Sequence, residues 1–177
     1  AVIVVLNPAQ LLAQARDGTR FADLDSIKSA IALYLTDYSA PALGTEKRAT
    51  FDTACGFSAA CVVPLAANLR TTAGLGWVGV ALNDITGGSP IPTLPIDPTN
   101  NTNYQYAYAG DNTNKTFELN ARLESQKQRG KMTTDGGEDG DGATECYGPD
   151  GTINTADDTW TGASCWYEAG TDPGLDL

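Results

Sequence analysis

The sequence predicts an α+β fold: one long N-terminal helix packed on a small antiparallel sheet, with long loops and a C-terminal metal-binding loop. Three observations support this prediction. Apolar residues near the N-terminus recur at steps of three and four, two later segments alternate apolar and polar residues, and 19 glycines and 9 prolines interrupt much of the rest. With 177 residues, 41% of them hydrophobic, the chain suits one domain with a single modest core.

The helix is predicted over residues 1–38, which contain a single proline and a single glycine. Five apolar residues repeat at helical spacing and share one face: Leu24, Ile27, Ile31, Tyr34 and Tyr38. The positions that would extend this face toward the N-terminus are Asp17 and Arg20. We therefore expect residues 1–22 to form a protruding half of the helix without packing partners in its own domain. Residues 23–177 are expected to form the globular part.

The apolar N-terminus, residues 1–6, is the candidate assembly element. Six residues make only about 9 Å of helix, against about 30 Å for the hydrocarbon core of a membrane, so they look like the end of a longer hydrophobic segment. A strand or a buried arm is the alternative. Pro8 is either the first residue of a helix capped by Asn7 or a kink inside a longer helix. The candidate assembly residues are Val2, Ile3, Val4, Val5, Leu6, Pro8 and Leu12.

The sheet is predicted from two segments with period-two alternation, residues 104–108 and 116–123, joined by a turn at 110–114. In the second segment one face is apolar and is expected to cover the helix: Phe117, Leu119, Ala121 and Leu123. Residues 165–167 could supply a third strand. The proline-rich stretch 87–98 is predicted to be extended, because its prolines exclude both helix and central strand.

Four cysteines and an apolar N-terminus favour an oxidising, extracytoplasmic setting. Zinc is the alternative, but the sequence has no CxxC pair and no histidine. Three pairings are possible for four cysteines. We predict the one that closes two local loops, Cys55 with Cys61 and Cys146 with Cys165.

The acidic excess lies in the C-terminal part of the chain. The net charge is −11; residues 1–131 contain eleven acidic and eleven basic residues, and residues 132–177 contain the other eleven acidic residues and no Lys or Arg. This distribution offers no footprint for a nucleic-acid backbone, so nucleic acid is not an expected partner. The acidic tail is either a solvated segment or a cation site.

The order of these features resembles the type IV pilins and the major pseudopilins of type II secretion. The residues that carry the resemblance are Asp23-Leu24 with Ile27, Ile31, Tyr34 and Tyr38, then Gly76-Trp77-Val78, Leu94-Pro95-Ile96-Asp97-Pro98, Tyr104 to Tyr108, Phe117-Glu118-Leu119 and Leu123-Glu124-Ser125. Two features depart from the family: the 42–75 connector is longer, and the family's N-terminal Phe-like residue and fifth-position Glu are absent.

The resemblance implies a pilin-like structural subunit of an extracellular pilus or a periplasmic pseudopilus, and it leaves these two alternatives open. Apolar half-helices would bundle in the filament core, and the globular domains would form its outer shell. The implied partners are identical subunits in a helical filament, and the inner membrane before assembly, through a segment preceding residue 1.

The loop between Cys146 and Cys165 is the candidate calcium site. Ca²⁺ takes about six to eight oxygen ligands from carboxylates, amides and backbone carbonyls. The candidate ligands are Asp150, the backbone of Ile153, Asn154, Asp157 and Asp158. The spacing is not that of an EF-hand, but the loop resembles the C-terminal calcium loop of major pseudopilins at three of these aspartates, so we expect one calcium ion. A solvated acidic loop held by its disulfide alone is the alternative.

Catalysis finds little support, because a chain without histidine cannot form Ser-His-Asp or Cys-His arrangements. We therefore do not expect an enzyme. Asn100 and Asn114 begin N-glycosylation sequons and are possible modification sites. The alternative function is a monomeric, secreted, calcium-dependent binding or adhesion module.

Overall fold

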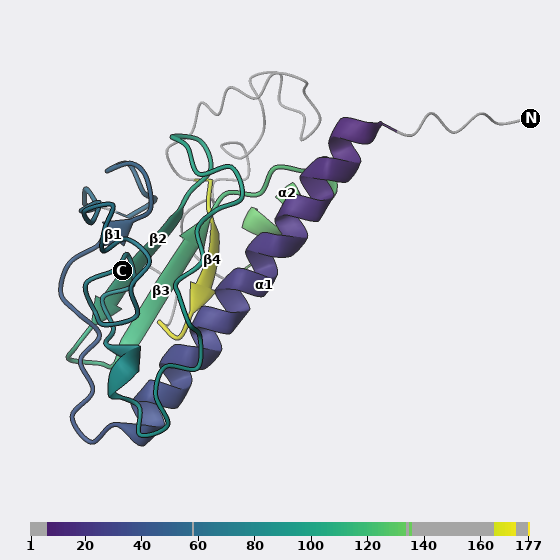
Figure 1. The fold of residues 1–177 in the computed structure, drawn as a ribbon. Helices are drawn as coiled ribbons and strands as arrows, with labels where there is room; N and C mark the ends of the chain where they lie inside the picture. The colour runs from purple at the N-terminus through teal and green to yellow at the C-terminus, as the bar shows by residue number, and fades with distance from the viewer. Residues whose placement is uncertain (1–6, 58, 134, 136–164, 173–176) are drawn as a thin grey trace, which may run out of the picture.

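The computed structural model describes residues 7–57, 59–133, 135, 165–172 and 177. These residues form an α+β fold in which a long helix lies along one face of a four-stranded antiparallel sheet (Figure 1). The elements, in chain order, are α1 (Pro8–Asp37), β1 (Arg48–Ala49), the short 3-10 helix η1 (Leu82–Asp84), β2 (Tyr106–Asp111), β3 (Thr116–Ala121), α2 (Gln126–Arg129), the 3-10 helix η2 (Gly130–Thr133) and β4 (Tyr167–Gly170).

Helix α1 begins at Pro8 and ends at Asp37. The side chain of Asn7 accepts a hydrogen bond from the backbone N–H of Ala9 at 3.1 Å, which satisfies one of the unpaired donors of the first turn. Pro8 suits the first helical position because it has no N–H to leave unpaired. Of the two interpretations of Pro8, the helix start is therefore the one observed. The helix was predicted to begin seven residues earlier, at residue 1; residues 1–6 lie outside the described residues.

The sheet has the order β1-β2-β3-β4, with every neighbouring pair antiparallel. The three predicted strands are present with different bounds: β3 begins at Thr116 as predicted and ends two residues earlier, whereas β2 and β4 are displaced toward the C-terminus. Strand β2 begins at Tyr106 rather than Tyr104, because the side chain of Asn101 accepts the N–H groups of Asn103 and Tyr104 in a turn just before it. Strand β1 was not predicted, since two residues are too few to show alternation.

The core lies between α1 and the sheet. The predicted helical face is confirmed: Leu24, Ile27, Ile31 and Tyr34 are buried, and Tyr38 packs at the edge of the same cluster. The apolar residues of β3 complete the core from the other side, as expected. The remaining members come from α1, from β2 and from the segments between these two elements, among them Leu43, Trp77, Val80, Leu82, Leu94, Tyr106 and Tyr108.

The face of the sheet turned away from α1 is also buried, which the alternating pattern did not predict. A second apolar cluster joins Ala49 and Ala107 to the disulfide-bonded Cys55 and Cys61. The connector therefore folds back over this face. Gly56 has a φ of +89°, and a Cβ there would lie 2.7 Å from the ring of Trp166, so only glycine lets the disulfide loop pack this closely.

Candidate functional site: the N-terminal part of α1

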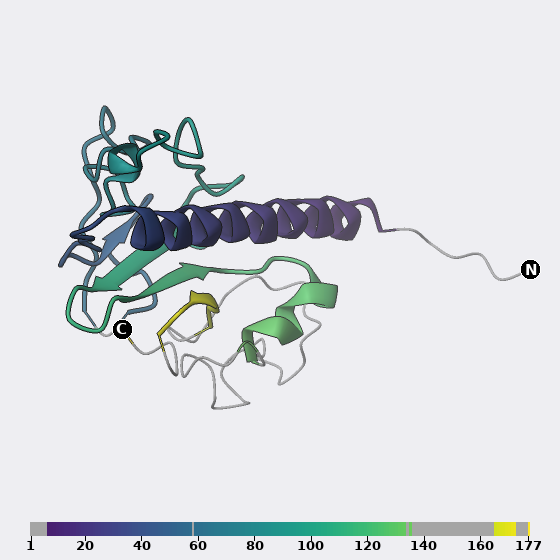
Figure 2. The same ribbon diagram turned by 90° about the horizontal axis from the view of Figure 1, so that it is seen from below.

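The first turns of α1 carry two adjacent leucines that the domain does not cover. Leu11 is 49% exposed and Leu12 is 60% exposed. On its other side the same turn is anchored, because the side chain of Gln10 accepts the backbone N–H of Gln126 at the start of α2. The helix therefore reaches the edge of the domain beside α2 (Figure 2). Its two leucine side chains there are exposed to solvent.

Asp17 and Arg20 are both fully buried, and Ala13 is 4% exposed. The expectation that the helix upstream of residue 23 lacks packing partners in its own domain is therefore wrong for these three residues. The buried face of α1 continues toward the N-terminus, and it changes from apolar to ionic. The part of α1 that leaves the domain is shorter than the sequence indicated, although a boundary at residue 22 was the natural prediction from apolar periodicity.

The side chain of Arg20 ties α1 to two distant segments. Its Nε and Nη2 donate to the two carboxylate oxygens of Asp97 at 2.6 and 2.9 Å, a bidentate pair. Its Nη1 donates to Asp17 at 2.8 Å and to Glu124 at 3.2 Å. We call these four residues, Asp17, Arg20, Asp97 and Glu124, the polar lock.

Two carboxylates of the polar lock also fix the backbone around them. Asp17 accepts the N–H groups of Glu124 and Ser125, each at 2.8 Å. Asp97 accepts the N–H groups of Thr99 and Asn100 at 2.8 and 3.2 Å. Each buried charge therefore has several hydrogen-bond partners, the condition under which burial of an ion pair is tolerated. The lock determines where the loop after β3 and the proline-rich stretch meet the helix.

The electrostatics of the polar lock follow from burial and pairing. Burial alone would lower the pKa of Arg20, but its hydrogen bonds and charge pairs with Asp97 and Asp17 outweigh burial and raise that pKa. Burial alone would raise the pKa of Glu124, yet the hydrogen bond from Arg16, at 2.6 Å, and the charge of Arg20 hold it below its ordinary value. Arg20 and Glu124 are thus held in their charged forms.

One turn further along α1, Asp23 shows the opposite behaviour. It is half-buried and accepts a hydrogen bond from the hydroxyl of Tyr106 at 2.8 Å. Burial raises its pKa above the ordinary value, and the hydrogen bond opposes this only in part. Ionisation of Asp23 therefore lowers the stability of the folded protein, whereas ionisation of Glu124 raises it.

Sequence reasoning missed the lock because Asp97 and Glu124 are remote from Arg20 in sequence. A partial signal was present in Asp17 and Arg20, which are three residues apart and so lie on the same side of a helix. Asp17 and Arg20 continue the apolar face of the helix toward the N-terminus. Opposite charges at this spacing are compatible with a buried ion pair as well as with an exposed end of the helix.

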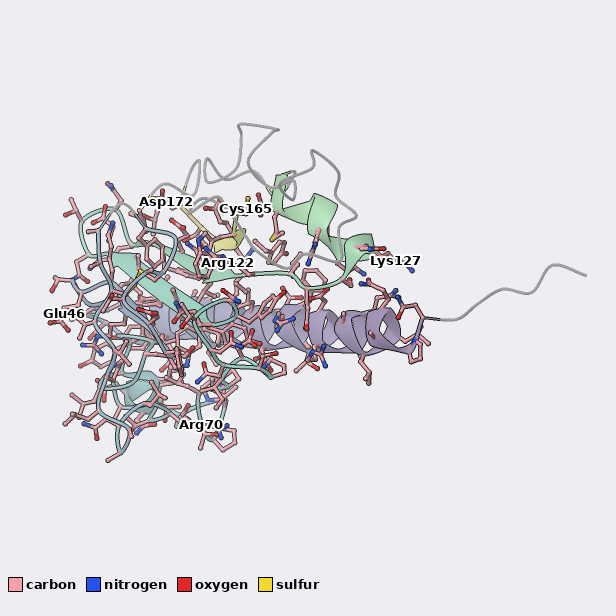
Figure 3. The ribbon with its side chains drawn as sticks, turned by 90° about the horizontal axis from the view of Figure 1, so that it is seen from above. Glu46, Arg70, Arg122, Lys127, Cys165 and Asp172 are labelled. Atoms are coloured by element: carbon pink, nitrogen blue, oxygen red, sulfur yellow. A yellow bond between two sulfur atoms is a disulfide. The ribbon has the colours of Figure 1, made fainter. Side chains whose placement is uncertain are left out.

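The other predicted site residues are distributed as follows. The disulfide between Cys55 and Cys61 is present, as predicted. Cys165, labelled beside β4 in Figure 3, is also disulfide-bonded, and its predicted partner Cys146 lies outside the described residues. Pro8 is exposed at the start of α1, and Leu12 is exposed beside it. Residues 2–6 of the assembly set lie outside the described residues.

The predicted calcium ligands, Asp150, Ile153, Asn154, Asp157 and Asp158, also lie outside the described residues. Within the described ranges, no three acidic, cysteine or histidine side chains gather as a metal site. Both sequon asparagines are in loops. Asn114 is exposed in the turn between β2 and β3, and its amide donates to Asp111 at 2.7 Å. Asn100 is partly exposed and has a φ of +43°.

Comparisons with known proteins give no relative: no family model, no curated protein and no solved structure matches this chain. Among the helices that the structure describes, none is both long enough and apolar enough to cross a membrane.

Proposed function

We propose that this chain is a structural subunit of a pilus-like filament that polymerises through the N-terminal end of α1. The observation that carries the proposal is the exposure of Leu11 and Leu12 at the end of a 30-residue helix whose remaining turns are bound to the domain. The chain in front of these leucines, residues 1–6, contains only apolar residues. An apolar element at the edge of a folded domain gains most by burial against other protein or lipid.

The polar lock supports the same proposal mechanically. When the exposed end of a helix is held in a filament, force on that end is transmitted to the contacts that attach the other turns of the helix to the domain. Behind the leucines, α1 is attached to the domain by the ion pair of Arg16 with Glu124 and then by Asp17 and Arg20, which bind Asp97 and the backbone at residues 124–125. The domain is thus fastened to the helix within about two turns of the proposed assembly element as well as through the apolar core.

A contact between the apolar end of one subunit and a different surface of the next is heterologous, and repetition of such a contact gives a helical polymer. In this proposal the filament is extracellular or periplasmic, in keeping with the disulfide of the connector. Calcium binding by the 146–165 loop is part of the proposal. In a monomeric, calcium-dependent binding module, the exposed leucines would have no role.

The proposal is tested by negative-stain microscopy of the full-length protein from its native cell envelope, with Leu12→Asp and Val4→Asp as variants. A charge placed in an apolar helix contact costs several kcal/mol when buried without a partner, so both variants should abolish filaments and leave the domain folded. Leu33→Asp is the matched control: Leu33 is 45% exposed on the same helix, far from its N-terminal end. Filaments of normal yield from the first two variants would contradict the proposal.

A further inference from the structure

The connector carries a second exposed apolar surface, which we call the connector surface: Val62, Val63, Leu65 and Leu75. Their exposed fractions are 48%, 37%, 76% and 60%. Val62 extends the sheet beyond β1, because its N–H donates to Lys47 at 2.7 Å and its carbonyl accepts from Ala49 at 3.1 Å. The first part of this surface is therefore held rigidly at the sheet edge.

Leu75 belongs to the same surface because of Arg48. The guanidinium of Arg48 donates to the carbonyls of Gly74 and Gly76, both at 2.8 Å, and Arg48 itself bridges to Val62. The turn that presents Leu75 therefore lies against the strand that holds Val62. Backbone hydrogen bonds from Leu69 to Leu65 and from Trp77 to Leu69 connect the two parts from the other side.

The four side chains of the connector surface carry no charge, although Arg48 lies against the turn of Leu75 and Arg70 is exposed between Leu65 and Leu75 in sequence. Residues 53–69 contain no Asp, Glu, Lys or Arg, the longest such stretch in the chain. The charge that follows, Arg70, donates to the carbonyl of Leu94 at 2.8 Å. Exposed apolar residues that gather in one place, rather than singly, mark an interaction surface.

The next-longest uncharged stretch of the chain is residues 1–15, and it contains the exposed Leu11 and Leu12. The first charge after them, Arg16, is paired with Glu124 at 2.6 Å. The two surfaces lie at opposite ends of the molecule: the connector loops gather beside β1, away from the N-terminal end of α1, in both views (Figures 1 and 2). Figure 3 shows the same separation between Glu46, at the start of the connector, and Lys127 of α2.

We infer that the connector surface binds Leu11 and Leu12 of a second copy of this chain. This inference rests on the proposed function and names the surface that receives the helix. The occupant follows from charge: the acidic excess of each copy lies in residues 132–177, so contacts between these regions of two copies repel, whereas apolar side chains from the two longest uncharged stretches of the chain can join without like charges meeting. Because the surfaces differ and lie at opposite ends, the contact is heterologous and can repeat without closing.

The test is a charge exchange in the full chain, followed by sedimentation velocity over a concentration series. Leu65→Lys places a cation on the connector surface, and Leu12→Glu places an anion on the helix. Each variant alone should weaken self-association by more than about tenfold, because the new charge faces an apolar partner. An equimolar mixture of the two should associate again, because the introduced lysine of one variant then meets the introduced glutamate of the other, and the two unaltered surfaces meet as in the original chain.

Leu33→Lys is the control and should associate like the unaltered chain. Loss of association in Leu12→Glu with none in Leu65→Lys would overturn this inference and leave the proposed function standing. Loss of association in both variants without recovery in the mixture would also overturn it, because the two surfaces would then not be partners of each other. If the unaltered chain stays monomeric at every concentration, both proposals are overturned. This holds whether or not the connector surface binds another protein.

Discussion

Arg20 shows how a single residue fixes the relation between the helix and its domain. Its guanidinium is fully buried and pairs with three carboxylates, Asp17 on its own helix and Asp97 and Glu124 far along the chain. The ring of Tyr104 lies under it, 5.0 Å from the guanidinium carbon to the ring centroid. A charge so enclosed cannot be removed without leaving its partners buried and uncompensated.

Replacing Arg20 by Met should therefore destabilise the domain by about 3–5 kcal/mol at neutral pH. Urea unfolding at pH 7 measures the change. Arg16→Met is the matched control, because the side chain of Arg16 is 35% exposed and its pair with Glu124 is only partly buried; it should cost less, about 1 kcal/mol. Equal losses from the two substitutions would mean that burial of the lock has no energetic consequence.

Two carboxylates near α1 should respond to pH in opposite directions. The pKa of Glu124 is lowered in the folded protein, so its stabilising contribution is present above the pKa of an unfolded Glu and is lost as the pH falls through the folded value. The pKa of Asp23 is raised, so its ionisation costs stability as the pH rises through and above the pKa of an unfolded Asp.

Glu124→Gln should consequently destabilise the domain at neutral pH, with the difference from the original chain shrinking on acidification. Asp23→Asn should be neutral or stabilising at neutral pH, because an amide oxygen can still accept from Tyr106, and its benefit should also fade in acid. Free energies of unfolding from pH 3 to pH 7 test both statements. A penalty for Asp23→Asn that grows with pH would contradict the raised pKa of this carboxyl.

At the scale of elements, the sequence predicted the type of each large element better than its bounds. Helix α1 and strands β2 and β3 follow from periodicity, because the apolar residues on one face of each lie in the core. Periodicity could not predict the burial of Asp17, since the partners of that carboxylate are backbone N–H groups more than a hundred residues away. Likewise, no local pattern shows that the connector covers the second face of the sheet, and this depends on Gly56 and the disulfide beside it.

The apolar face of α1 gives the element-scale prediction. Ile27 and Ile31 are fully buried against the sheet, so each substitution by Ala should lower the free energy of unfolding by about 2–4 kcal/mol. Leu33→Ala, on the exposed side of the same helix, should change it by less than about 0.5 kcal/mol. Denaturant unfolding of the three variants makes the comparison. Similar losses at all three positions would indicate that helix propensity, rather than packing, determines the cost.

Over the whole molecule, charge divides the chain into a region that is neutral in sum and a region that is strongly acidic. Residues 1–131 are neutral in sum, and several of their charges pair with one another, as in the polar lock. Residues 132–177 contain eleven acidic residues and no basic ones. The acidic residues of the second region repel one another, and this region has no basic residue to offset the repulsion. A bound cation is therefore the simplest means of offsetting it.

Calcium should accordingly stabilise the folded protein, with free ion at a hundred times its dissociation constant adding about 2.7 kcal/mol. Chelation should lower the melting temperature, and Asp157→Ala should lower it similarly and make it insensitive to chelator. Acidification should mimic chelation, because protonated carboxylates are poor ligands. Asp139→Ala, in the acidic run outside the proposed site, is the control and should keep the response to calcium. Identical melting curves with calcium and with excess chelator would mean that the 146–165 loop is a solvated tether and that its acidic residues are offset by solvent and salt alone.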